Sequence, residues 1–336
     1  LAQAAALDTD AAAGRWHGPL HGIPIGIKDI IDVAGWPTAA GVSTDAVTGT
    51  TGRPQPAERD APLVASLRRA GAIILGKTVT TAFACFDPPP TANPHNLDHT
   101  PGGSSSGSAA AVAAGMCLAA IGSQTGGSIT RPAAFCGVAG AKPSLGRVPC
   151  TGVVPISEHL DHPGPLARSV TDLATMLDVL SGHDPDDPGS LSLPHPGTVT
   201  TVARLANLPP QLGWLGGFFD ERADEEARGA VATAVATWEA AGGAVCRPGL
   251  PPGFADVLEH HRIVLVAGLA ANHAEYFPGH ADEYPVGLAG LIREGLEFPM
   301  TRFIAARRHQ RVLQREILAC FNDCDVLVCP AATGAA

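Results

Sequence analysis

The chain has 336 residues, of which 45% are hydrophobic and 16% charged, and its formal net charge is −10. This composition predicts a large buried core in one large domain or two ordinary ones. The acidic balance, without any cluster of Lys and Arg, argues against nucleic acid and against an anionic membrane surface as partners. No apolar run reaches the ~18 residues of a transmembrane helix, and we expect no signal peptide.

The first half of the sequence predicts short apolar strands that alternate with helices. In chain order, we expect a surface helix at 1–14, a buried strand within 21–35, a helix and a strand within 61–78, irregular chain at 87–103, a helix passing into a strand at 106–122, little regular structure at 125–144, and an amphipathic helix at 168–182.

The second half begins after a stretch rich in Pro, Asp and Gly. We interpret 183–200 as linker-like, 1–182 as the core that carries the reactive residues, and 201–336 as a helical, substrate-pocket part of the same domain. The last of these ends soon after an apolar strand, so we expect it to be truncated at its C-terminus. Its predicted elements are helices at 221–242, 253–275 and 300–320 and a strand at 325–330.

Eight cysteines are scattered through apolar segments of the chain. In a chain of this length, the pattern favours reduced, buried thiols and a cytoplasmic location. Cys320, Cys324 and Cys329 lie closest together, but their spacings of four and five differ from the CxxC pairs of a structural zinc site. We therefore expect no metal site, and we expect His260 and His261 to be surface or capping residues.

Two Gly-Gly-Ser turns, which end at Ser104 and Ser128, flank an Ala-rich run. Adjacent backbone N–H groups beside a hydroxyl, as before Ser128, are typical of an oxyanion hole. A serine nucleophile also needs a base. Lys28 lies in an apolar strand, where loss of solvation would lower its pKa and leave it neutral near pH 7.

Other interpretations of these residues stay open at this point. Each glycine turn alone is compatible with an ordinary turn, and Lys28 alone with a strand-edge lysine whose amine reaches solvent. The upstream His95 and His99 are not excluded as the base by their distance in the sequence. The two turns and the buried lysine together favour a catalytic site.

Five segments in a fixed order carry a resemblance to a known family: HGIPIGIKD, PGGSSSGSAAAVAAG, TGGSITRPAAFCG, AKPSLGRVP and HLDHPGPLARSVTDLA. Together they resemble the amidase signature family over about residues 17–182, with weaker similarity beyond. The resemblance implies an α/β fold with a mixed central β-sheet covered by helices on both faces. It also implies hydrolysis of an amide C–N bond without a metal or an organic cofactor.

The resemblance further implies a Ser–cis-Ser–Lys triad. Ser128 matches the nucleophile, Ser104 the bridging serine in a cis peptide, and Lys28 the base. In this mechanism Ser104 relays the proton of Ser128 to Lys28, Ser128 attacks the amide carbonyl, and water clears the acyl-enzyme. Asp161 matches a generally structural position. The other matched residues are Thr125, Gly126 and Gly127 in the oxyanion loop and Ser105 as a support of the triad.

One departure from the family pattern bears on the substrate. Many members have an arginine two positions after the nucleophile, whereas Arg131 lies three positions after Ser128. This shift resembles malonamidase-type members, in which the arginine pairs the free carboxylate of a malonamate-like substrate. The planar guanidinium suits such a carboxylate. The alternative is that Arg131 only braces the loop through backbone carbonyls.

We keep several alternatives to this interpretation. Within the family they are the glutaminase (A) subunit of a tRNA-dependent amidotransferase, an amidase for neutral aliphatic or aromatic amides, and a truncated, inactive chain. Outside it they are a GxSxG nucleophile elbow around Ser105 and a glycine-rich anion-binding module. The expected partner is a small-molecule amide, and a homodimer is one expectation for the oligomeric state.

Overall fold

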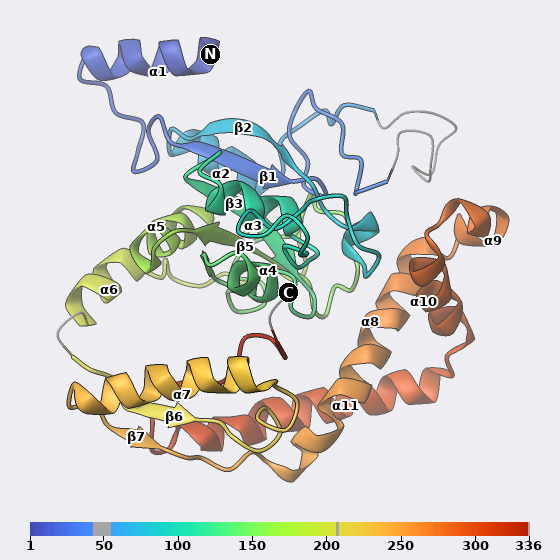
Figure 1. The fold of residues 1–336 in the computed structure, drawn as a ribbon. Coiled ribbons are helices and arrows are strands. Elements are labelled where there is room, and N and C mark those ends of the chain that lie inside the picture. The colour runs from blue at the N-terminus through green and yellow to red at the C-terminus, as the bar shows by residue number, and fades with distance from the viewer. Residues whose placement is uncertain (43–54, 206–207, 335–336) are drawn as a thin grey trace.

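A five-stranded mixed sheet forms the centre of the first half of the chain in the computed structural model, which describes residues 1–42, 55–205 and 208–334 (Figure 1). Its order is β2-β1-β3-β5-β4; β1 runs parallel to β2 and β3, and β5 runs antiparallel to β3 and β4. This confirms the mixed central sheet. The strands are β1 (Pro24–Lys28), β2 (Ile73–Thr78), β3 (Ala119–Gln124), β4 (Ala139–Gly140) and β5 (His162–Ala167).

Helices cover both faces of this sheet. In β3, Ile121 belongs to the core cluster that contains Leu67 of α2 and Met176 of α5. Its neighbour Ala120 packs instead with Val112 of α3. Because successive side chains of a strand point to opposite faces, α2 and α5 cover one face and α3 covers the other. The helices are α2 (Pro62–Arg69), α3 (Ser106–Ala113), α4 (Thr130–Phe135) and α5 (Val170–Leu180).

A small parallel sheet of order β7-β6-β8 lies in the second half of the chain. The helix that connects β6 to β7 begins at Glu225, four residues after the predicted start, because the Asp224 carboxylate accepts a hydrogen bond from Ala227 N (2.8 Å) and two acidic residues follow in the first turn. These elements are β6 (Leu212–Trp214), α7 (Glu225–Ala240), β7 (Val245–Cys246) and β8 (Val326–Val328).

Helix α8 (Val257–His273) packs the second half against the first. A Cβ on Gly268 would lie only 2.7 Å from the Ser157 side chain, so the helix approaches this loop closely. Ser157 Oγ donates to Val264 O (3.3 Å), and Asn272 Nδ2 donates to Ile156 O (3.1 Å). One buried cluster therefore joins α8 to the strands of the central sheet. The neighbouring helices are α9 (Phe277–His280), α10 (Val286–Glu297) and α11 (Met300–Glu316).

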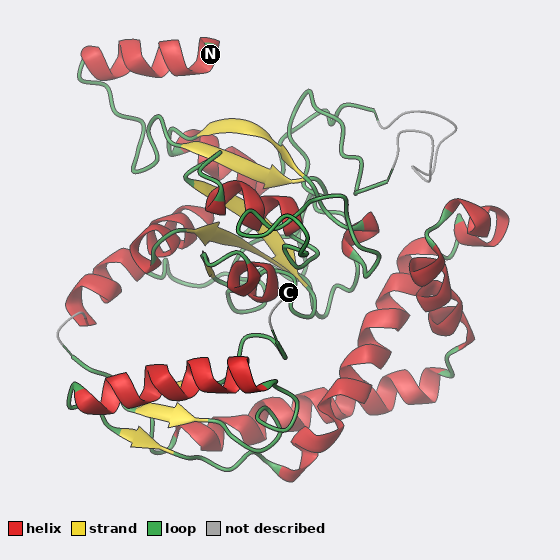
Figure 2. Cartoon of the chain, viewed as in Figure 1, coloured by secondary structure: helices red, strands yellow, loops and turns green. Residues whose placement is uncertain are grey.

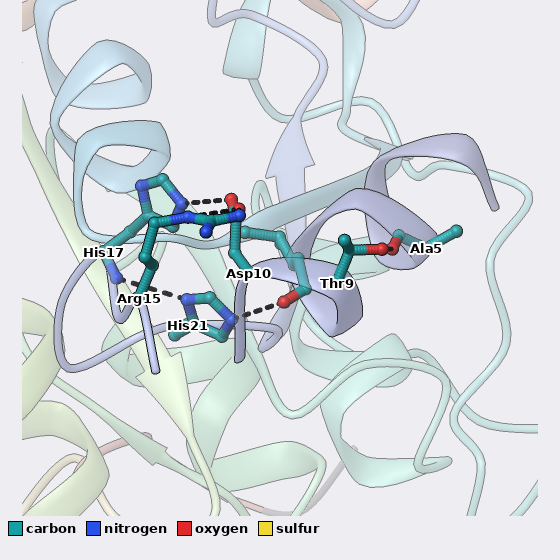
Figure 3. Close-up of polar contacts among 7 residues, drawn as sticks. Ala5, Thr9, Asp10, Arg15, His17 and His21 are labelled. Carbon is teal, nitrogen blue, oxygen red and sulfur yellow. Dashed lines mark hydrogen bonds and ion pairs between the residues drawn. The ribbon is translucent and has the colours of Figure 1, made fainter. Parts of the chain in front are cut away.

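The N-terminal helix α1 (Ala2–Ala12) has no buried residue, which confirms the predicted surface helix. Polar contacts hold it at the edge of the body (Figure 3). Asp10 pairs with Arg15 and with His17 Nε2 (2.8 Å), and His21 Nε2 lies 3.0 Å from Leu7 O. These contacts attach the helix to the segment that leads into β1, and near its N-terminal end Gln3 Nε2 donates to Ala72 O (3.1 Å).

Several elements differ from the sequence prediction, and the short strands β6 and β7 are among those that it lacks. Strand β5 was missed because its two prolines disfavour a strand, yet Pro165 contributes its carbonyl, which accepts from Ala141 N (3.0 Å). Helix α10 was also missed. Helix α6 (Thr198–Leu205) begins inside the stretch interpreted as linker-like.

The chain between β2 and α3 is mostly loop, as predicted for 87–103 (Figure 2).

Among the described residues, no helix is long and apolar enough to cross a bilayer. All eight cysteines are free, and the described part of the chain holds no group of three or more His, Cys, Asp or Glu arranged for a metal. The 3-10 helices are η1 (Ala82–Ala84), η2 (Pro252–Asp256), η3 (Ala281–Glu283) and η4 (Ile317–Phe321).

Candidate active site

Lys28 is the last residue of β1 and is fully buried. Its Nζ donates to Ser104 Oγ (2.7 Å) and to Ser123 Oγ (2.8 Å). Burial lowers the pKa of this amine to about 7, although the nearby carboxylate of Asp161 acts in the opposite direction. A substantial fraction of Lys28 is therefore neutral at neutral pH, as the sequence predicts, and its neutral nitrogen can accept a proton.

Ser104 lies in a loop whose shape depends on two glycines. The peptide bond between Gly103 and Ser104 is cis. Gly102 has a φ of 75°, and a Cβ there would lie 2.9 Å from Pro132 Cα. Only glycine fits such a position without strain. The loop enters α3 directly, so the hydroxyl that contacts Lys28 is attached to a buried helix.

Ser128 follows β3 by four residues and lies in the wall of a cavity that Ser104 also lines. Ser105 N donates to Ser128 O (3.2 Å), which ties the two serine loops together. Within the part of the chain that the structure describes, the Ser128 hydroxyl has no hydrogen-bond partner. The structure thus joins Lys28 to Ser104 directly and brings Ser128 to the same wall, and both the helix α3 and the strand β3 set the separation of the two loops.

Thr125, Gly126 and Gly127 form the turn before Ser128 and line the same cavity. The Gln124 side chain shapes this turn, because its Oε1 accepts from Ile129 N (2.8 Å) and Thr130 N (2.9 Å). The two ends of the turn are therefore held together around the Ser128 hydroxyl.

Asp161 anchors the same turn from β5's side of the sheet. Thr125 Oγ1 donates to Asp161 Oδ1 (2.5 Å), and Asp161 Oδ2 accepts from Ile156 N (2.8 Å) and Ser157 N (2.9 Å). Burial raises the pKa of this carboxyl, while its hydrogen bonds from Thr125 and the backbone act against that rise. The contacts give Asp161 the structural position that the resemblance implies.

Ser105 lies behind the site and does not face the cavity. Its Oγ donates to Ser123 O (3.1 Å) and accepts from Ser123 N (3.2 Å), so it joins the Ser104 loop to β3. A Cβ on Gly122 would lie 2.7 Å from this hydroxyl. Ser123 itself, the second acceptor of Lys28, was missed in the sequence, because a serine inside an apolar strand carries no signal of its own.

The cavity has a volume of about 550 Å³. One wall comes from α8, which contributes Leu258, His261, Arg262 and Leu265. These positions are spaced as one face of a helix. No pattern in the sequence predicts this wall, because only the packing of α8 shows which of its faces meets the site. The prediction that His261 is a surface or capping residue is wrong.

Arg131 lies at the N-terminal end of α4 and lines the cavity. Its Nε (3.2 Å) and Nη2 (2.8 Å) both donate to Gly103 O, the carbonyl oxygen of the cis peptide itself. This is the bracing contact of the alternative interpretation. The bonds also hold the guanidinium at the cavity wall, and among the described residues none accepts a hydrogen bond from Nη1.

The two upstream histidines lie outside the cavity lining. His95 Nε2 contacts Cys136 O (2.9 Å), and neither His95 nor His99 is among the residues that line the cavity. Lys28 is thus the buried basic group next to the serines.

The hydroxyl of Ser105, the centre of the GxSxG pattern, is turned away from the cavity. Ser105 also follows a loop, whereas a nucleophile elbow follows a strand.

The site combines a mixed α/β sheet, two glycine-flanked serine loops and a buried lysine. The family model described as Amidase matches residues 1–336, and the chain belongs to this family. It is an enzyme that hydrolyses amide C–N bonds.

Similar proteins span several substrates. The chain is 35% identical over 341 residues to the AtzE component of the 1-carboxybiuret hydrolase of Pseudomonas sp. (strain ADP), covering 98% of this chain and 71% of that protein. It is 34% identical to a glutamyl-tRNA(Gln) amidotransferase subunit of Chromohalobacter salexigens, covering 99% and 72%. The X-ray structure of the peptide amidase from Stenotrophomonas maltophilia superposes with a TM-score of 0.81 at 31% identity, covering 98% and 75%.

Proposed function

We propose that the chain hydrolyses a small carboxylate-bearing amide through an acyl-enzyme on Ser128, with Ser104 and Lys28 completing the triad. The observation that carries the proposal is the 2.7 Å hydrogen bond from the buried Lys28 Nζ to Ser104 Oγ in the wall that also holds Ser128. Because Ser104 both contacts Lys28 and lines the cavity, it can transfer a proton between the cavity and the lysine.

The reaction begins with proton transfer. With its pKa lowered to about 7, Lys28 is neutral often enough to take the Ser104 proton while Ser104 takes that of Ser128. Ser128 Oγ then forms a bond to the amide carbon, and the carbonyl π electrons move to its oxygen. Collapse of this intermediate breaks the C–N bond, and the proton held by Lys28 returns through Ser104 to the leaving nitrogen.

The turn at 125–127 would stabilise the negative charge that develops on the carbonyl oxygen. Its backbone N–H groups lie beside Ser128 and carry no bulky side chain at Gly126 or Gly127, so an oxygen can approach them. A water molecule activated by the same relay then hydrolyses the ester on Ser128. Every group in this scheme belongs to the chain itself.

The charge of the cavity supports a carboxylate on the substrate. Among its lining residues, Arg131 and Arg262 are the charged ones, and both are positive. The carboxylate of Glu294 pairs with Arg262, which leaves Arg131 as the cation available to a substrate. The name of the relative from Pseudomonas sp. also describes a carboxylated substrate, 1-carboxybiuret.

A second candidate is the glutaminase of a tRNA-dependent amidotransferase, favoured by the 34% identity to the relative from Chromohalobacter salexigens. It would use the same triad and pass its ammonia to a partner. An amidase for neutral amides remains the third candidate. A cytoplasmic location, a homodimer and the division at 183–200 remain predictions of the sequence.

Ammonia release from a panel of amides tests the proposal. The panel contains malonamate, succinamate, glutamine, isobutyramide and benzamide, with Ser128→Ala as the control. We expect release from malonamate and succinamate and a loss of at least about 10³-fold in the variant. Release from glutamine alone would favour the glutaminase, and release from neutral amides alone would leave Arg131 as a brace. Equal release by Ser128→Ala would contradict the triad.

A further inference from the structure

The wall that α8 contributes has polar groups that the proposed mechanism does not use. His261 is half-buried and lines the cavity, and none of the described residues forms a hydrogen bond with its ring. Its neighbour His260 differs: the His260 ring stacks on His309 at 3.9 Å and contacts Asp256 O at 3.0 Å, away from the site. Two consecutive histidines of one helix therefore have different surroundings.

His261 of α8 and Arg131 of α4 both lie close to the turn at 125–127. A Cβ built on Gly126 would lie 3.5 Å from His261 Nε2. A Cβ built on the next residue, Gly127, would lie 3.8 Å from Arg131 Cβ. Because Gly126 and Gly127 are consecutive, the His261 ring and the base of the Arg131 side chain both lie next to the turn that would hold the substrate carbonyl.

The other groups near this turn are already engaged. Arg262 donates from Nε to Glu294 Oε1 (3.0 Å), and the same carboxylate also contacts its Nη2. Thr125 Oγ1 is held by Asp161. Arg131 and the His261 ring, which both line the cavity, therefore remain available to a polar substituent next to the scissile carbonyl.

We propose that His261 is a specificity-determining residue that donates a hydrogen bond from Nε2 to the substrate carboxylate, while Arg131 binds the same carboxylate. This inference rests on the proposed function of the Ser128 site. The substrate class is then an amide whose carboxylate lies one or two carbons from the scissile carbonyl, since the two side chains lie beside the consecutive residues Gly126 and Gly127.

The ring of His261 suits this role in its neutral form. Burial lowers its pKa, so at neutral pH one ring nitrogen carries hydrogen and the other accepts. The neutral His261 ring can donate a directed hydrogen bond to the carboxylate without adding a second positive charge to that of Arg131. Selection for the carboxylate would then depend on both residues, and the loss of either would weaken it.

Protection of Ser128 from a neutral serine reagent tests the inference. The probe is phenylmethanesulfonyl fluoride, whose sulfur is attacked by the serine oxygen with loss of fluoride. Malonate is the protecting anion, and malonamide is its neutral counterpart of similar shape. The variants are His261→Leu and His261→Gln, with His260→Leu as the matched control on the same helix.

We expect malonate to protect the wild type, and His261→Leu to raise the half-protecting concentration of malonate about tenfold or more. The same variant should leave protection by malonamide unchanged when each half-protecting concentration is measured against that variant's own unprotected labelling rate. His261→Gln should restore much of the effect, because its amide offers a donor of similar reach. His260→Leu should match the wild type.

Three results would overturn the inference. Unchanged protection in His261→Leu, or an equal loss for malonate and malonamide, would leave His261 without a role toward the carboxylate. Labelling of Ser128 that malonate does not slow would also reject it, and in all three cases the labelling itself would still support the triad. Absence of any labelling at Ser128 in the wild type would instead contradict the proposed function.

Discussion

Lys28 is the residue whose surroundings change its chemistry most. It is fully buried between two serine hydroxyls, and its pKa falls from an ordinary 10.5 to about 7 because burial disfavours the ammonium. The unfolded chain keeps the ordinary value. Between these two values the unfolded chain binds more protons than the folded one, so the contribution of Lys28 to stability rises with pH.

This difference predicts a stability effect of Lys28→Met. The difference in free energy of unfolding, wild type minus variant, should rise between about pH 7 and about pH 10 by roughly 1.4 kcal/mol per pH unit. The two proteins share the other ionisable groups, so the difference isolates Lys28. Urea denaturation at several pH values measures it. A difference that stays flat across this range would mean that Lys28 keeps its charge in the folded protein.

The residues proposed for the triad can be picked out in the sequence, but their surroundings could not be predicted from it. Lys28, Ser104 and Ser128 lie in motifs that are recognisable along the chain. Ser123 and His261 have no such motif, because one is a serine in an apolar strand and the other a histidine on a long helix. Their contacts with the site exist only once β3 and α8 are packed.

At the scale of elements, strand β3 positions the site through its contact with the loop before α3. Gly122 makes this contact possible, because a Cβ there would lie 2.7 Å from Ser105 Oγ and 2.8 Å from Leu166 Cδ1. Both neighbours are themselves buried. The strand can therefore approach the Ser105 loop only where a side chain is missing.

Gly122→Ala should consequently destabilise the protein by about 1–3 kcal/mol and slow the labelling of Ser128, since overpacking displaces the Ser105 hydroxyl. The control is Gly229→Ala in α7, where a Cβ meets no atom within 4 Å and alanine favours the helix. Thermal unfolding and labelling rates compare the two. If Gly122→Ala behaved like Gly229→Ala, the close packing of β3 on this loop would be wrong.

Local patterns of the sequence predict most elements with their approximate bounds. The helix and strand within 61–78 and the long helix α7 have clear periodicity and end signals. Strand β5 contains two prolines, so its place between β3 and β4 depends on sheet pairing and not on propensity. Helix α6 begins at Thr198, where the Asp178 carboxylate accepts from its backbone nitrogen (2.7 Å) across a distance of twenty residues.

At the scale of the whole molecule, the two halves of the chain contribute different parts of one site. The first half supplies both serine loops, the lysine and Arg131, and α8 of the second half closes the opposite wall. The core cluster continues from β1 into α8 and α10, so this wall is packed on the sheet that carries Lys28. The chemistry could be predicted from motifs in the first half, whereas the substrate contacts depend on this packing.

The most direct test of the account is the pH dependence of Ser128 modification by phenylmethanesulfonyl fluoride, with the modified residue located by peptide mass. We predict that the reagent modifies Ser128, that the rate rises as pH increases through about 7 as Lys28 loses its proton, and that Ser104→Ala slows it at every pH. Modification at another residue, or a rate on Ser128 that neither pH nor Ser104→Ala changes, would contradict activation of Ser128 by Lys28.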